Sequence, residues 1–60
     1  MFISFTTIKG ISYFLNISSI FYVVKNDKKN NAIVCSIDGD MFEIDESYDS
    51  FCSRLLNFSK

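Results

Sequence analysis

SIDGDMFEIDE, residues 36–46, gathers five acidic side chains around one glycine, and its interpretation decides the fold. A calcium-binding EF-hand loop needs its glycine at the sixth position, after carboxylates or amides at the first, third and fifth. If Gly39 is sixth, the first position falls on Val34 and the third on Ser36. The EF-hand pattern therefore fails, and we expect no metal site in this stretch.

A β-hairpin explains the same stretch. Apolar and polar residues alternate on both sides of Asp38-Gly39, which suits a two-residue type I′ turn. This turn would place Ile37 opposite Asp40, Cys35 opposite Phe42, and Ile33 opposite Ile44. The predicted buried face is Ile33, Cys35, Ile37, Phe42 and Ile44. Because successive side chains of a strand point to opposite faces, a slip of one residue would reverse this arrangement.

An earlier hairpin is predicted over residues 2–16. FISFTTI, residues 2–8, is rich in β-branched and aromatic residues and stops at Lys9-Gly10. A three-residue loop with a left-handed Gly10 would pair Thr7 with Ile11, Phe5 with Tyr13, and Ile3 with Leu15. The shared apolar face is then Ile3, Phe5, Ile11, Tyr13 and Leu15. Phe2 and Phe14 are left on the other face, where a monomer would carry polar residues.

A third strand is predicted at IFYVVK, residues 20–25, and it is apolar on both faces. Alternation puts Ile20, Tyr22 and Val24 on one face and Phe21 and Val23 on the other. In so small a protein, a strand with two apolar faces needs cover from another subunit.

The periodicity changes at Tyr48, where the apolar residues begin to follow a helical spacing. The stripe consists of Tyr48, Phe51, Cys52, Leu55 and Leu56 and predicts an amphipathic helix of about three turns. Asp45 or Ser47 is the expected N-cap.

These elements predict a mainly β (α+β) fold, in which a small curled antiparallel sheet or partly open barrel of about five strands carries one C-terminal helix. The expected strands cover about 2–8, 11–16, 20–26, 32–37 and 40–45, and the helix covers about 46–57. They form one small domain over residues 1–60.

The composition predicts self-association. A 60-residue chain buries only ~60% of the surface that its unfolded form exposes, so it needs help from disulfides, metals or partner subunits. Two cysteines and no histidine exclude a zinc site, and 48% hydrophobic residues with seven Phe and three Tyr exceed what one small core can hide. We therefore predict a homo-oligomer whose interface residues are Phe2, Phe14, Phe21 and Val23.

The charge pattern limits the class of partner. The net charge of -1 provides no basic field for a phosphate backbone, so nucleic-acid binding is disfavoured. Acidic side chains gather on the outer face of the second hairpin and at the start of the helix. We predict that Asp38, Asp40, Glu43 and Asp49 form a binding surface for a protein partner with a basic surface.

Catalysis is not expected. Cys35 and Cys52 fall on predicted core faces as inert thiols, and a disulfide between them would require an oxidising compartment. A nucleophilic cysteine usually has a histidine as its base, and the chain has none. Gly10 and Gly39 both lie in predicted turns, so no phosphate-binding loop exists. The sequence predicts a protein that is not an enzyme and holds no cofactor.

The first part of the chain is too polar to cross a membrane. Its longest uncharged stretch, 11–24, has 14 residues against the ~20 needed, and no basic segment of a signal peptide precedes it. We expect a cytoplasmic protein, in a bacterial cell or a phage-infected host.

Several motifs occur in a distinctive order: FISFTTIKG, then YFLN and Ile20, then IVCSIDG and MFEIDESYDS. This order resembles the small flagellar and swarming-motility (FlbD-like) protein family over nearly the whole chain, and short phage or mobile-element proteins look similar. The matching residues are Thr6, Gly10, Leu15, Asn16, Ile20, Ile33, Gly39, Phe42, Ile44, Glu46 and Ser47. The resemblance implies a strand and turn, a hairpin and a C-terminal helix.

Three functional hypotheses follow. The first is a small non-enzymatic interaction or regulatory protein that acts as a homo-oligomer and binds another macromolecule. The second is a phage- or mobile-element-encoded inhibitor of a host defence or regulatory complex, which would use its acidic surface to occupy a site for nucleic acid. The third is an oligomer that sequesters a small nucleotide in aromatic pockets at subunit junctions.

Overall fold

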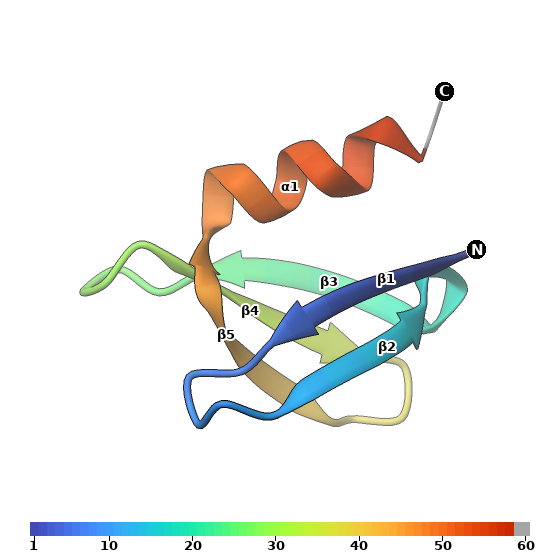
Figure 1. Cartoon of the computed structure of the whole chain (residues 1–60), viewed down its shortest axis with the longest axis horizontal. Helices are drawn as coiled ribbons and strands as arrows, with labels where there is room; N and C mark the ends of the chain where they lie inside the picture. Colours follow the sequence, from blue (N-terminus) through green and yellow to red (C-terminus); the bar gives the residue numbers. More distant parts are fainter. Residues whose placement is uncertain (59–60) are drawn as a thin grey trace.

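In a computed structural model, which describes residues 1–58, the strands curl around one core and a helix lies across one side of them (Figure 1). The elements in chain order are β1 (Phe2–Thr6), β2 (Ser12–Asn16), the short 3-10 helix η1 (Ile17–Ser19), β3 (Ile20–Lys25), β4 (Asn31–Ser36), β5 (Met41–Ser47) and α1 (Tyr48–Asn57). The predicted fold class, a curled antiparallel sheet with one C-terminal helix, is confirmed.

The strands form two antiparallel sheets that meet at one point. β1 pairs with β2, and β4 lies between β3 and β5. A bridge joins Thr7 to Ile44, and the Ile8 N–H donates to the Glu43 carbonyl at 3.0 Å. These contacts bring the end of β1 beside β5. β2 and β3 each have one neighbouring strand, so β2 is a terminal strand of the first sheet and β3 of the second.

The first hairpin has the predicted register. Phe5 lies opposite Tyr13 and Ile3 opposite Leu15, and the Thr7 N–H donates to the Ile11 carbonyl at 2.8 Å. Gly10 adopts φ +84°, the left-handed conformation that the three-residue loop requires. Ile3 and Phe5 are buried as expected, whereas Ile11 is 50% and Tyr13 38% exposed.

The second hairpin has a different register from the predicted one. Its turn has three residues, since the Ser36 N–H donates to the Asp40 carbonyl at 2.9 Å and Gly39 adopts φ +92°. The pairs are therefore Cys35 with Met41, Val34 with Phe42, and Ile33 with Glu43. The predicted type I′ turn and its pairs are wrong by one residue.

With this shift the core side of β4 is that of Ala32 and Val34, although Cys35 is also buried, as predicted, and Ile33 is half-buried. Ala32 and Val34 are fully buried in the core, while Ile37, predicted to be buried, is 62% exposed. Phe42 and Ile44 still face the core, as predicted.

The two turns share one sequence pattern, which explains why the second turn also has three loop residues. In each turn a residue with a side-chain hydroxyl is followed by Ile, a charged residue and Gly. The hydroxyl of the first residue accepts a bond from the backbone N–H four residues later: Ile11 to Thr7 Oγ1 and Asp40 to Ser36 Oγ, both at 3.2 Å. These side-chain bonds support the three-residue loop in both hairpins.

β3 also departs from simple alternation. A β-bulge lies between Ile20 and Tyr22, and it turns both Ile20 and Val23 toward the core cluster. Phe21 and Tyr22 are consequently both exposed.

α1 begins at Tyr48, two residues after the predicted start. Ser47, one of the two expected N-caps, accepts a hydrogen bond from the Ser50 N–H at 3.1 Å. Phe51 of α1 is fully buried between the strands, whereas Leu56, the last residue of the predicted stripe, is 65% exposed. The helix packs on β3, β4 and β5. No helix of residues 1–58 is long and apolar enough to span a membrane.

Candidate interaction surfaces

Two predicted interface residues form an exposed aromatic pair on the outer face of the first hairpin. The rings of Phe2 and Phe14 stack with centroids 5.0 Å apart and planes 11° apart. Phe14 is 71% exposed and Phe2 is 49% exposed. The strands direct both rings outward, because Ile3, Phe5 and Leu15 occupy the inner face of the same hairpin. This stacked pair is a continuous apolar patch rather than two scattered residues.

Phe21 lies on β3, the other terminal strand, and forms a separate patch. It is 70% exposed, and its ring packs against Tyr22 at a centroid distance of 5.2 Å. Val23, predicted to belong to the same interface, is half-buried and packs against the core cluster, so it does not share the exposed face of Phe21. The β-bulge is the physical reason, since one extra residue changes which side chains face outward.

The predicted acidic surface is divided into several places. Asp38 and Asp40 lie exposed at the second turn, whereas Asp49 lies in the first turn of α1, beyond the far end of β5. Glu43 is half-buried, and its Oε2 accepts hydrogen bonds from the side-chain amides of Asn26 and Asn31, both at 3.1 Å. Glu43 therefore stabilises the β3–β4 loop. The four carboxylates do not form one patch, and residues 1–58 contain no group of three or more carboxylate or thiol side chains placed to hold a metal ion.

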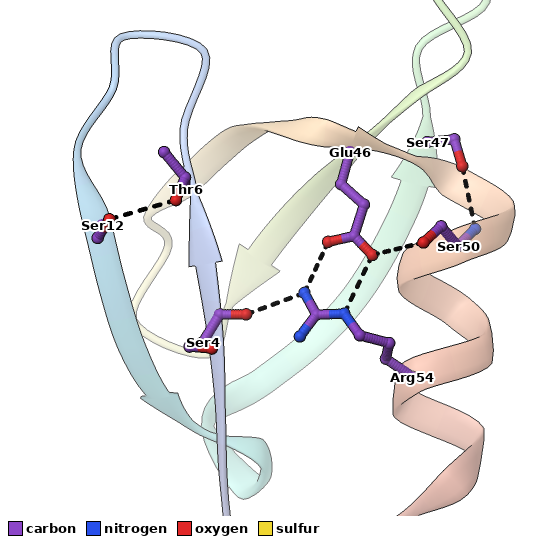
Figure 2. A network of polar contacts seen from close by, with 7 residues as sticks. All are labelled: Ser4, Thr6, Ser12, Glu46, Ser47, Ser50 and Arg54. Carbon is purple, nitrogen blue, oxygen red and sulfur yellow. Dashed lines mark hydrogen bonds and ion pairs between the residues drawn. The ribbon is translucent and has the colours of Figure 1, made fainter.

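A polar network joins α1 to the strands (Figure 2), and the sequence did not reveal it. Arg54 Nη2 lies 2.6 Å from Glu46 Oε1, and Arg54 Nε donates to Glu46 Oε2 at 3.0 Å. Arg54 Nη2 also donates to the Ser4 carbonyl of β1 at 2.9 Å. The hydrogen bonds from Arg54, with a weaker contribution from that of Ser50, hold the pKa of Glu46 below its usual value. Glu46 and Arg54 lie on either side of the strand-to-helix corner, so no helical or strand spacing links them in the sequence.

A pocket lies between the two turns. Its volume is about 520 Å³, and the residues that line it come from the two turns and the strands beside them: Thr7, Ile8, Lys9, Ile11, Tyr13, Asp40, Met41, Phe42 and Glu43. Two of the lining residues, Tyr13 and Phe42, have ring centroids 4.8 Å apart. Lys9 contributes one positive charge to the lining, and Asp40 and Glu43 contribute two negative charges. The lining combines polar and apolar side chains in similar measure.

Both cysteines are free. Cys35 is buried and Cys52 is half-buried, and each lies next to a tyrosine, Tyr22 and Tyr48 respectively. A hydrogen bond to the adjacent thiol raises the pKa of each tyrosine.

Comparison with known proteins gave no match among protein-family models, curated proteins or solved structures. The resemblance to the FlbD-like family therefore stays a prediction from the motifs alone.

Proposed function

We propose that the protein is a small, non-enzymatic interaction protein that associates with itself and binds another macromolecule. The observation that carries the proposal is the exposure of Phe14 on β2 and Phe21 on β3, each a terminal strand of its own sheet. Both rings are exposed, so the side chains of another chain can pack against them.

The hydrophobic effect favours burial of these exposed rings by another chain. Removing one large apolar side chain from water contributes about 1.5–3 kcal/mol. The Phe2–Phe14 stack brings two such side chains together, and a copy of the chain brings two more. A chain of 60 residues has little core of its own, so association adds stability where the fold most needs it.

The second turn supplies a surface for a different macromolecule. Asp38 and Asp40 are exposed there, and the apolar side chains of Ile37 and Met41 are exposed beside them. This combination fits a protein partner with basic residues around an apolar centre. Complementary charge steers such partners and accelerates their association.

Light scattering over a range of protein concentrations tests the self-association. We expect the mass to rise above the 6.9 kDa of one chain as the concentration increases from micromolar to near-millimolar. A mass of one chain throughout would overturn the proposed self-association.

A pair of affinity purifications tests the second surface. The wild type and an Asp38→Asn/Asp40→Asn variant are used as baits in extracts of the native host. We expect a basic protein that the wild type retains and the variant loses, with retention that falls as salt is added. Equal retention by both baits would contradict the role of the acidic turn.

A further inference from the structure

We propose that the open edge of β2 pairs with β2 of a second copy of the chain, antiparallel, with Phe14 opposite Phe14 at the two-fold axis. The inference rests on the proposed self-association and specifies the surface, the partner and the register.

The hydrogen-bond pattern shows which backbone groups of β2 are unused. In an antiparallel pair, hydrogen-bonded and non-hydrogen-bonded residue pairs alternate. The Thr7 N–H donates to the Ile11 carbonyl at one end of the hairpin, and the Ile17 N–H donates to the Met1 carbonyl at the other. Because bonded pairs alternate between these ends, Tyr13 and Leu15 direct their backbone groups toward β1. The backbone N–H and C=O groups of Ser12, Phe14 and Asn16 therefore point away from β1. Within residues 1–58, β2 has no strand on that side.

The other open edges carry features that oppose strand addition. Natural proteins protect edges with bulges and lysines. β3 has both, a bulge between Ile20 and Tyr22 and a lysine at Lys25. The side of β1 away from β2 is occupied at one end by the bridge from Thr7 to Ile44, and further along by Arg54, which binds the Ser4 carbonyl (Figure 2).

β2 has no such protection. Its sequence, SYFLN, contains no charged residue and no proline, and its pairing with β1 runs without a bulge. An exposed edge of this kind is a site of strand pairing.

A second copy fits this edge because the edge is self-complementary. The residues whose backbone groups point outward are polar, aromatic and polar in order, and an antiparallel copy presents the same order. With Phe14 opposite Phe14, Ser12 lies opposite Asn16 of the other copy, and no like charges meet. The Phe2 ring stacks on each Phe14, so four aromatic rings gather on one face of the joined sheet. This two-fold contact closes on itself and gives a dimer rather than a fibre.

Two variants with equally exposed aromatic positions test the surface. Phe14→Lys places a charge at the proposed axis, and Phe21→Lys places the same charge on β3. The two positions are matched in exposure, since Phe14 is 71% and Phe21 is 70% exposed. We expect sedimentation to show a dimer for the wild type and Phe21→Lys, and only the 6.9 kDa chain for Phe14→Lys. Circular dichroism checks that both variants fold, which their exposure favours. A dimer of Phe14→Lys, or loss of the dimer in Phe21→Lys alone, would overturn the proposal.

Cysteine cross-linking tests the register. Opposed residues of a hydrogen-bonded antiparallel pair have Cα atoms about 5.5 Å apart, within the range that a disulfide spans. Phe14→Cys should therefore form a cross-linked dimer on oxidation. Ser12→Cys should not, because its two copies would lie roughly 13 Å apart. Wild type with its native Cys35 and Cys52 is the control. Cross-linking of Ser12→Cys but not of Phe14→Cys would refute the register.

The outcomes separate this inference from the proposed function. If the wild type and Phe14→Lys both dimerise, the contact through β2 is refuted but the proposed self-association is not. If the wild type stays monomeric, both are refuted.

Discussion

At the scale of single residues, Glu46 and Arg54 connect three parts of the fold. The Arg54 guanidinium binds the Glu46 carboxylate and the Ser4 carbonyl and lies 5.3 Å from the centre of the Phe51 ring. The pair is partly exposed, with 38% of the Arg54 and 22% of the Glu46 side chain accessible, so solvent weakens its contribution.

The substitution Glu46→Gln should lower the free energy of unfolding at neutral pH by about 1 kcal/mol, because it removes the charge that Arg54 binds. The pKa of Glu46 is lower in the folded than in the unfolded state. Its stabilising effect is therefore present above the ordinary pKa of 4.5 and is lost as the pH falls through the folded-state pKa. Denaturant titrations of both proteins from neutral to acidic pH should show the difference shrink below about pH 4.5.

Asp45→Asn is the control for this prediction, since Asp45 is exposed on the same strand. Its effect should stay within about 0.5 kcal/mol. A difference between wild type and Glu46→Gln that is the same at every pH would show that the ion pair does not contribute as described.

At the scale of elements, the turn of the second hairpin sets the register between β4 and β5. Alternation placed Phe42 and Ile44 correctly on the inner face of β5. The length of the turn then determined which residues of β4 pair with β5. The hydrogen bonds between Ser36 and Asp40 close a three-residue loop, and this loop shifts the pairing by one residue. The same hydroxyl-Ile-charge-Gly pattern stands in the first hairpin, where the three-residue loop was predicted correctly. Comparison of the two turns was the signal in the sequence that could have fixed the register.

Two alanine substitutions distinguish the registers. Val34→Ala should lower the free energy of unfolding by about 2 kcal/mol, because Val34 is fully buried. Ile37→Ala should change it by no more than about 0.5 kcal/mol, because Ile37 is exposed at the turn. Chemical denaturation measures both, and the opposite order would support the two-residue turn instead.

A second pair of substitutions tests the orientation of α1. Phe51→Ala should cost about 3–5 kcal/mol, since Phe51 is fully buried and packs edge-on against Phe5. This is comparable with the whole stability of a domain this small, so circular dichroism should show a largely unfolded chain. Leu56→Ala, on the exposed side of the same helix, should unfold like the wild type; a large loss there would mean that the helix presents a different face to the sheet.

At the scale of the whole molecule, the sequence predicted more of the architecture than of the site. Alternation predicted a small curled antiparallel sheet or partly open barrel with Phe2 and Phe14 on its outer face, and both residues are exposed there. The positions of Val23 and Glu43 could not be predicted, because they depend on local irregularities of the backbone. A bulge turns Val23 inward, and two asparagine amides bind Glu43 through contacts that depend on how the loop folds. Neither effect leaves a periodic signal.

The two terminal strands differ in the protection of their open edges, and this difference determines where self-association is expected. β3 carries a bulge and Lys25, whereas β2 carries an uncharged edge with a stacked pair of rings beside it. Self-association should therefore occupy β2 and leave β3 and the acidic turn available to another partner.

Amide hydrogen exchange measured by NMR at increasing protein concentration tests this claim most directly. The Ser12 and Phe14 amides point to the open edge of β2, and the Val23 and Lys25 amides point to that of β3. Protection of Ser12 and Phe14 should rise with concentration, while Val23 and Lys25 exchange at a constant rate. If Phe14 exchanges at the same rate at all concentrations, or if protection appears at Val23 instead, the dimer through β2 is contradicted.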